Sequence, residues 1–192
     1  MKAYKTSKTY TETYKAWTQP KFSDNTLITG GVYYNLTASQ TYSTHYPWHA
    51  FDQSTAGNNG WWTGNIDVTT SNPAWICLEC DHKLKLTSVK LKGDTKGAEN
   101  PKQGTVQVSN DCVTWKNVGS FSFASNAAGL EVVCTLTPQE GYHYYRVYCT
   151  DEWADGVVFG EITFYGQIAT TARQSAIRTL TVKGAGSVKM VR

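Results

Sequence analysis

The chain has 192 residues, 40% of them hydrophobic, enough to bury one sizeable core with appendages or two very small domains. It holds 7 Trp and 12 Tyr against only 2 Met, a composition that, with abundant Thr, Val and Gly, favours β-strands. No apolar run approaches the roughly eighteen residues of a membrane-spanning helix. The N-terminus, MKAYKTSKTYTETYKAW, lacks the apolar segment of a secretory signal. We therefore expect neither membrane insertion nor a signal peptide, unless a signal has been removed.

The net charge of +3 hides an uneven distribution. Residues 1–36 carry five Lys and two acids, residues 37–166 carry eight Lys or Arg and thirteen acids, and residues 167–192 carry five Lys or Arg and no acid. A nucleic-acid binder normally places its basic patch on the folded surface, so an acidic body argues against that class. The basic ends are expected to dock onto something acidic or to be solvated.

Five cysteines, an odd number, argue against a complete disulfide framework. Cys77 and Cys80 form a single CxxC, and no second CxxC is present to complete a tetrahedral zinc site. The alternating apolar residues around them indicate a strand, which would point the two thiols to opposite faces. Buried free thiols are therefore expected rather than a metal or redox pair.

Residues 1–36 are polar and rich in Thr, Tyr and Lys, which predicts an exposed strand or an extended arm. From Asn35 onward, short apolar runs recur between clusters of Gly, Asn, Asp and Pro: AWICLEC, LTSVKLKG, GTVQVS, WKNVGSFSF, LEVVCTL, YYRVYCT and VVFGEITFYG. Strands of this length and spacing indicate an antiparallel sandwich or barrel. The last residues, TLTVKGAGSVKMVR, predict a small β-hairpin.

The stretch PWHAFDQSTAGNNGWW, residues 47–62, places one carboxylate, Asp52, among Gly and Asn residues. Calcium takes roughly six to eight oxygen ligands, often backbone carbonyls with one or two carboxylates, so Asp52 is a candidate cation ligand. The alternative is that Asp52 caps the loop by accepting hydrogen bonds from backbone amides. A catalytic Asp52 would need a partner, and no GxSxG, HExxH or P-loop motif is present.

In YHYYRVYCT, strand alternation places Tyr144, Arg146 and Tyr148 on one face and Tyr145 and Val147 on the other. Arg146 is the only Lys or Arg between Lys116 and Arg173. We expect it to form an ion pair on the strand surface.

Six segments in order carry a family resemblance: AFD with the loop that ends in WWT, PAWICLECD, LTSVKLKG, VQVSNDCVTWKNV, YYRVYCT and GEITFYG. Together they resemble the discoidin family, also called F5/8 type C domains, within the galactose-binding-like jelly rolls. Cys80 and Asp81 replace the usual ending of the second segment, and Cys112 stands where glycine is usual. The resemblance does not cover residues 1–36 or 168–192.

The resemblance implies an all-β fold, an eight-stranded antiparallel jelly-roll sandwich over residues 37–167. An N-terminal arm (1–36) and a basic C-terminal extension with a β-hairpin (168–192) would flank it. The family is not catalytic by itself, and its loops at one end bind glycans or, in some branches, phospholipid headgroups or proteins. The loops of this chain are acidic and would repel anionic headgroups, so a glycan is the expected ligand.

The resemblance also implies a structural calcium ion (Ca2+). Carried over by position, Asp52 and Glu161 are the expected side-chain ligands. Carbonyls near Ala50, Asn58 and Gly60 would supply the rest.

For the glycan, the resemblance points to Trp153 in the loop TDEWADG, because an aromatic ring suits the apolar face of a sugar. Adjacent loops add His45 and Tyr46 in STHYPW, and Asp94 and Asn100 in GDTKGAENPK. The Arg that relatives often carry in the last loop is missing, and its only possible replacements are Lys92, Lys96 and Lys102. The resemblance places Trp62, Trp75 and Trp115 at core positions.

We therefore expect a non-catalytic carbohydrate-binding adhesion module, stabilised by calcium, that recognises a glycan on a cell surface. The absent signal and the free thiols indicate a protein that assembles in the cytoplasm, such as a phage tail or head appendage in a virion, or otherwise a surface-associated protein. Its termini would dock on other subunits or form a homo-oligomer. The alternative is a structural virion protein whose jelly roll binds only other subunits. An enzyme would need two facing acids among Asp94, Asp151, Glu152 and Asp155.

Overall fold

The computed structural model describes residues 11–54, 60–96 and 99–172. These residues form eleven strands and one short 3-10 helix, η1 (Pro47–Phe51). The strands are β1 (Tyr14–Thr18), β2 (Thr26–Thr29), β3 (Val32–Ala38), β4 (Trp61–Trp62), β5 (Ala74–Lys92), β6 (Pro101–Ser109), β7 (Lys116–Ser122), β8 (Glu131–Thr135), β9 (Tyr142–Glu152), β10 (Val158–Phe159) and β11 (Glu161–Ala172). The apolar runs of the sequence therefore form strands as predicted, and two of them, AWICLEC and LTSVKLKG, belong to the single long strand β5.

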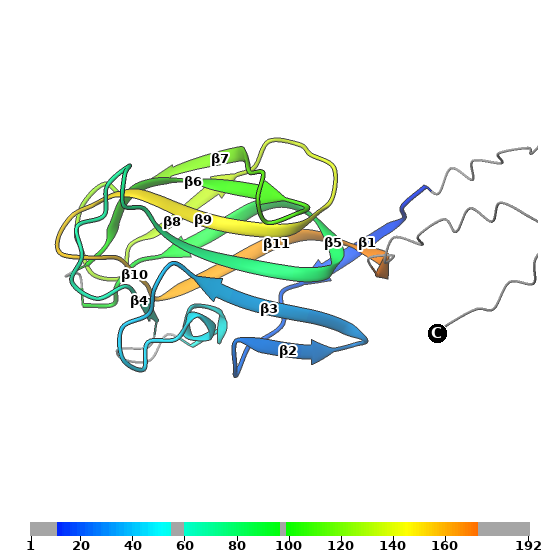
Figure 1. Ribbon diagram of the computed structural model, residues 1–192, viewed down its shortest axis with the longest axis horizontal. Helices are drawn as coiled ribbons and strands as arrows, with labels where there is room; N and C mark the ends of the chain where they lie inside the picture. Colours follow the sequence, from blue (N-terminus) through cyan, green and yellow to red (C-terminus); the bar gives the residue numbers. More distant parts are fainter. Residues whose placement is uncertain (1–10, 55–59, 97–98, 173–192) are drawn as a thin grey trace, which may run out of the picture.

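All the strand pairs are antiparallel, and β5 is shared between two layers of the sandwich (Figure 1). Its first part, Ala74–Glu79, lies between β3 and β9, and this layer continues through β6 to β7. Its last part, Ser88–Lys92, lies between β11 and β8, and β11 continues this layer to β1. The fold is the antiparallel jelly roll that the sequence predicts.

The core lies between the layers and contains the large aromatic side chains. The fully buried aromatic residues are Trp61, Tyr145, Phe22, Phe51, Phe123, Phe159 and Phe164. Aliphatic residues of β5, including Leu78 and Leu91, complete the contact between the layers. This packing fixes the strands whose connecting loops carry the candidate site.

Residues 14–36 belong to the sandwich, in contrast to the arm that the sequence predicts for residues 1–36. β1 pairs with β11 from Tyr14 opposite Ala169 to Thr18 opposite Tyr165, and β2 forms a hairpin with β3. Phe22 has no exposed surface and packs edge-on against Phe51. Residues 1–10 and the predicted C-terminal hairpin lie outside the described residues, and β11 extends the folded region to Ala172.

The five cysteines are free thiols, as expected. Cys80 lies in the hydrophobic core, whereas Cys77 is buried on the opposite face of β5. Strand alternation therefore separates the two thiols of the CxxC. Cys112 is exposed and has a φ of 61°, a conformation that favours the glycine usual at this position.

The two ends of the sandwich carry different elements (Figure 1). The short ribbon of β4 and β10 lies at one end, together with the loops beside it. We call this end of the sandwich the apex. The beginning of β1 and the end of β11 lie together at the other end, because Tyr14 pairs with Ala169. None of the described residues forms a helix with the length and hydropathy that crossing a membrane requires.

Candidate functional site

The loop that carries Asp52, a predicted cation ligand, follows η1 directly. Asp52 ends this helix, is only 5% exposed, and accepts a hydrogen bond of 2.8 Å from the backbone amide of Ser54 to Oδ1. Gln53 has a φ of 54°, in the left-handed region, and this turns the backbone sharply after Asp52. His49 Nδ1 lies 3.7 Å from Asp52 Oδ2. Asp52 therefore caps its loop, the alternative that the sequence left open, while its carboxylate also faces a second acid.

That second acid is Glu161, the first residue of β11. Both its carboxylate oxygens are buried, and neither accepts a well-formed hydrogen bond. Burial, together with the charge of Asp52, raises the pKa of Glu161 to about 8, while a weaker contact with the Gln53 backbone amide opposes the rise. Two buried carboxylates that interact in this way create a strongly negative position, and a bound cation would stabilise it.

Of the remaining expected ligands, Ala50 and Gly60 lie within the described residues. Ala50 is completely buried, and the Gly60 carbonyl lies 3.3 Å from His45 Nδ1. Asn58 lies outside the described residues. The described part of the chain holds no group of three or more His, Cys, Asp or Glu arranged for a metal ion. The donor set therefore fits a hard cation held by two carboxylates and carbonyls better than it fits zinc.

The two adjacent tryptophans of β4 point in opposite directions. Trp61 is completely buried in the core, and its Nε1 donates to the Gln40 carbonyl at 2.8 Å. Trp62 is only partly buried, and its ring packs against Tyr42 at 4.5 Å and perpendicular to His45 at 5.4 Å between centroids. The core position expected for Trp62 is thus taken by Trp61, and Trp62 belongs to an aromatic cluster with Tyr42 and His45.

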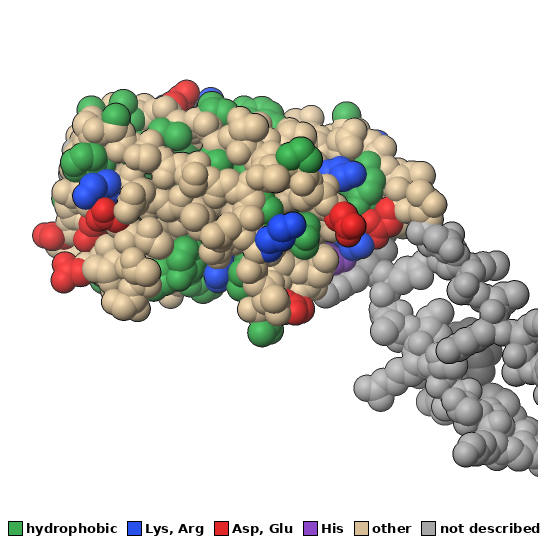
Figure 2. Space-filling model, turned by 90° about the horizontal axis from the view of Figure 1, so that it is seen from above, with side chains coloured by type: hydrophobic (Ala, Val, Ile, Leu, Met, Phe, Trp, Pro, Cys, Tyr) green, Lys and Arg blue, Asp and Glu red, His purple; other side chains and the backbone are tan. Residues whose placement is uncertain are grey.

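Acidic groups border this aromatic cluster. Burial and the charge of Asp94 raise the pKa of Glu99, and the proximity of His45 opposes this rise. Asp155 also raises the pKa of Glu99 and is itself exposed. Figure 2 shows acidic side chains gathered at the apex end of the molecule, the left-hand end of the view. The apex therefore combines aromatic rings with several acidic side chains.

Asp94 and Asn100 hold one apex loop closed. Asn100 is completely buried, its Oδ1 accepts from the Asp94 amide at 2.7 Å, and its Nδ2 donates to the Ala127 carbonyl at 2.8 Å. Asp94 Oδ1 accepts a hydrogen bond from the Lys96 amide. A ligand cannot reach Asn100 in this conformation, and the structure gives it a role in shaping the loop instead.

Trp153 lies on the next loop, and its amide donates to the Asn100 carbonyl at 3.2 Å. Its ring is 41% exposed, while its Nε1 donates to the Phe123 carbonyl. The Lys102 ammonium lies 5.4 Å from the centre of this ring and also pairs with Asp151 at 3.0 Å. Trp153 therefore offers an exposed ring with a cation beside it.

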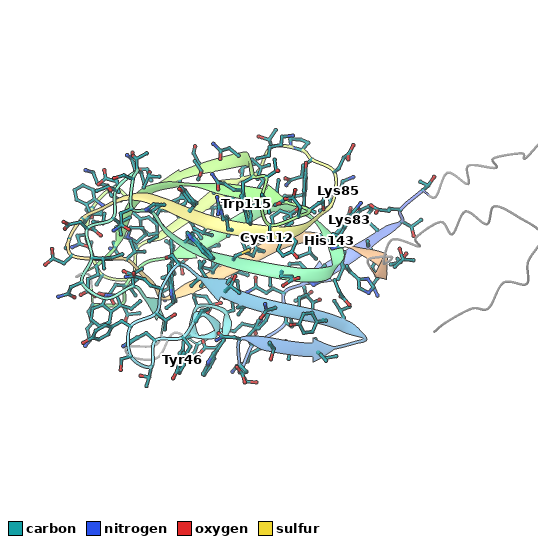
Figure 3. The ribbon with its side chains drawn as sticks, viewed as in Figure 1. Tyr46, Lys83, Lys85, Cys112, Trp115 and His143 are labelled. Carbon is teal, nitrogen blue, oxygen red and sulfur yellow. The ribbon has the colours of Figure 1, made fainter. Side chains whose placement is uncertain are left out.

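Tyr46 lies apart from the other candidates. It stacks with His49 and borders a shallow pocket together with Asp24 and Trp48, next to η1 (Figure 3). The structure thus brings His45, Asp94, Asn100 and Trp153 onto adjoining apex loops and leaves Tyr46 on another surface.

Sequence reasoning missed Tyr42, Trp62 and Glu99 as apex residues. The pair Trp61–Trp62 did carry a usable signal, since neighbours on a strand face opposite sides and only one of them can enter the core. The positions of Tyr42 and Glu99 depend on loop conformations that no short sequence pattern specifies.

Comparison with known families decides where this fold belongs. The F5/8 type C domain family matches residues 35–163. The chain belongs to the F5/8 type C, or discoidin, family. No curated protein matches this discoidin domain.

Solved structures support the assignment. Chitosan-binding module 1 of a chitosanase/glucanase from Paenibacillus sp. IK-5 has 25% sequence identity and a TM-score of 0.55, over 69% of this chain and 94% of that one. A family 32 carbohydrate-binding module of C. perfringens, solved with galactose, has 13% identity and a TM-score of 0.58, over 69% of this chain and 93% of that one. Another Clostridium perfringens module, solved with GalNAc-β-1,3-galactose, has 13% identity and a TM-score of 0.55, over 69% of this chain and 95% of that one. The discoidin domain therefore has the fold of carbohydrate-binding modules.

Proposed function

We propose that this discoidin domain is a non-catalytic carbohydrate-binding module that holds a glycan at the apex. The observation that carries the proposal is the cluster of Trp62, Tyr42 and His45, partly exposed beside Glu99. An aromatic ring can cover the apolar C–H face of a sugar while neighbouring polar groups bind its hydroxyls. Trp153 provides a second exposed ring on the adjoining loop.

The charge of the apex favours an amino sugar. Glu99 interacts electrostatically with Asp94 and with Asp155, and Glu152 lies within electrostatic range of Asp155. A protonated glucosamine carries a positive charge that these carboxylates would attract, whereas an acidic sugar would be repelled. The similar Paenibacillus module is described as binding chitosan, a polymer of such sugars. We therefore propose chitosan-like glycans as the ligand class.

Titration calorimetry with a chitosan tetrasaccharide tests this function. Trp62→Ala removes the central ring of the aromatic cluster, and we expect it to weaken binding at least tenfold while the domain stays folded. Glu99→Gln is expected to weaken binding of the chitosan tetrasaccharide more than binding of its fully N-acetylated counterpart, because only the former is cationic. Tyr165→Ala removes an exposed ring on β11 and serves as the control, with unchanged affinity expected. If no glucosamine or N-acetylglucosamine oligosaccharide binds, the function is wrong.

We further propose that a calcium ion binds between Asp52 and Glu161, with carbonyls near Ala50, Asn58 and Gly60 as further ligands. The unpartnered buried oxygens of Glu161 support this site. Bound calcium would hold the loop between η1 and β4 in one conformation and would shape the adjoining apex without contacting the glycan.

Thermal unfolding checks the calcium site. Millimolar calcium should raise the melting temperature above its value in chelator, since the ion binds only the folded state. Asp52→Ala should abolish this rise, whereas Asp24→Ala, which removes an exposed carboxylate elsewhere, should retain it. The same melting temperature with and without calcium would rule the site out.

We also propose that the protein is a module within a larger assembly, such as a phage virion that adheres to a cell-surface glycan. The described chain begins and ends opposite the apex, so the apex would face away from whatever the termini join (Figure 1). The competing proposal is a structural virion protein that binds only other subunits. Assembly through the termini without any glycan binding would favour that alternative.

A further inference from the structure

The guanidinium of Arg146 is held between two aromatic rings on the outer face of the β9 layer. Its central carbon lies 3.9 Å from the ring centre of Trp115 and 4.6 Å from that of Tyr148. Nε donates a hydrogen bond of 2.6 Å to Gln107 Oε1, on the neighbouring strand β6. Gln107 in turn donates from Nε2 to Asn117 on β7 at 2.7 Å. Arg146 is thus fixed in one orientation by contacts from three directions.

This arrangement replaces the ion pair that the sequence predicts. No carboxylate of the described residues lies within 4.0 Å of the guanidinium nitrogens, and the bond from Nε to Gln107 is the one side-chain hydrogen bond that Arg146 makes in this part of the chain. Burial lowers the pKa of Arg146, yet an arginine stays charged at any physiological pH. The face therefore holds a positive charge without an anionic partner.

The neighbouring titratable groups of the described residues form no ion pair with it. Glu79 accepts hydrogen bonds from Tyr144 at 2.9 Å and from Asn35 at 3.3 Å. Burial raises the pKa values of Cys77 and Cys112, so both thiols are neutral. Asp111, on the loop before β7, accepts from the amides of Val113 and Thr114 and from the Ser109 hydroxyl.

The position lies well away from the apex. Arg146 is near the middle of β9, opposite Cys77 on β5 and Gln107 on β6. Figure 3 shows Trp115 over the central part of the sheet, not at the end that carries β4 and β10. In the same register, Thr37 on β3, Cys77 on β5, Arg146, Gln107 and Asn117 follow one another across the strands.

We propose that this face is a second binding site, which takes the carboxylate of an acidic sugar such as a uronic acid. A planar guanidinium whose two terminal nitrogens are unpaired matches a carboxylate with two parallel hydrogen bonds. Asn117 and Thr37 are exposed and can bind sugar hydroxyls along the same row. The site is separate from the apex. It would bind an anionic sugar, whereas the apex would bind a cationic one.

The test is an NMR titration of the full chain with sodium D-glucuronate at about 20 mM, well above a millimolar dissociation constant. We expect saturable shifts of the Trp115 indole N–H and the Arg146 Nε–H signals. D-Glucose, which lacks the carboxylate, should leave both signals unchanged. These wild-type measurements do not depend on whether any variant folds, and the absence of saturable shifts with glucuronate would overturn the proposal.

Variants and competing anions test whether binding depends on the Arg146 guanidinium and on the sugar ring. Arg146→Lys keeps the charge but loses the planar fork, and it should weaken glucuronate binding at least tenfold, whereas Lys116→Gln should change it less than twofold. Equal losses in the two variants would mean general electrostatic attraction and would overturn the site. Sulfate or N-acetylglutamate that binds as tightly as glucuronate would overturn the assignment to a sugar. Trp62→Ala should bind glucuronate normally, so the two sites can fail independently.

Discussion

Glu161 is the residue whose environment differs most from that of an ordinary carboxylate. It is 7% exposed, its oxygens have no well-formed hydrogen bond, and Asp52 adds negative charge. Its pKa is raised from 4.5 to about 8, so the folded state binds this proton more tightly than the unfolded state does. The stabilisation from the protonated group is complete below pH 4.5 and is lost as the pH rises through about 8.

In chelator, the melting temperature of the wild type should therefore fall between about pH 5 and about pH 8. Glu161→Gln keeps a neutral group of similar shape at every pH, so its melting temperature should fall less over this range. Differential scanning calorimetry at several pH values measures how the melting temperature of each protein changes with pH. A loss of 1 kcal/mol in stability lowers the melting temperature by roughly 2–4 °C for a domain of this size. Parallel slopes for wild type and variant would show that Glu161 titrates normally.

The positions of single side chains could be predicted from the sequence where strand alternation determines them, but not where the conformation of a loop determines them. Cys77 and Cys80 lie on opposite faces as predicted, because their strand is regular. Asn100 was expected in contact with a ligand, yet it is buried because the loop folds around its amide group. Arg146 was expected in an ion pair, whereas Trp115, distant in sequence, takes that place.

Among the elements, β1 completes the β11 layer, and Gln19 extends that pairing beyond the end of the strand. Gln19 is 3% exposed, its Nε2 donates to the Ile162 carbonyl at 2.7 Å, and its Oε1 accepts from the Phe164 amide at 2.8 Å. Its side chain therefore satisfies two backbone groups of β11 as a paired strand would. Its own backbone carbonyl accepts a hydrogen bond from the Gln53 side chain, in the loop that follows η1.

Gln19→Ala leaves those two buried backbone groups of β11 without partners, at about 1–3 kcal/mol for each group. We expect a clear loss of stability in urea unfolding with little change in glycan affinity. Gln167→Ala, at an exposed position of the same strand, should change the stability by less than about 0.5 kcal/mol. An effect of Gln19→Ala no larger than that of Gln167→Ala would show that the Gln19 side chain does not stabilise the β11 layer.

The strands of the jelly roll could be predicted from the sequence, since apolar runs such as YYRVYCT alternate and end at turn residues. β1, β2 and most of β3 could not, because residues 14–36 are polar on their exposed sides and few of their side chains reach the core. Phe22, Tyr34 and Leu36 are the buried apolar anchors of that segment.

Across the whole molecule, charge separates the two candidate binding surfaces. Glu99 and its acidic neighbours make the apex negative, while Arg146 leaves one positive charge on the β9 layer. The described chain enters and leaves the sandwich at the end opposite the apex. This arrangement suits a module that is anchored at one end and binds a glycan at the other.

The most direct test of glycan binding at the apex is a map of the NMR shifts caused by a chitosan tetrasaccharide. We expect the shifts to centre on the Trp62 indole N–H and on the loops that carry Tyr42, Glu99 and Trp153, with the Trp115 indole unaffected. Shifts centred on Trp115, or no saturable shift at all, would contradict this expectation.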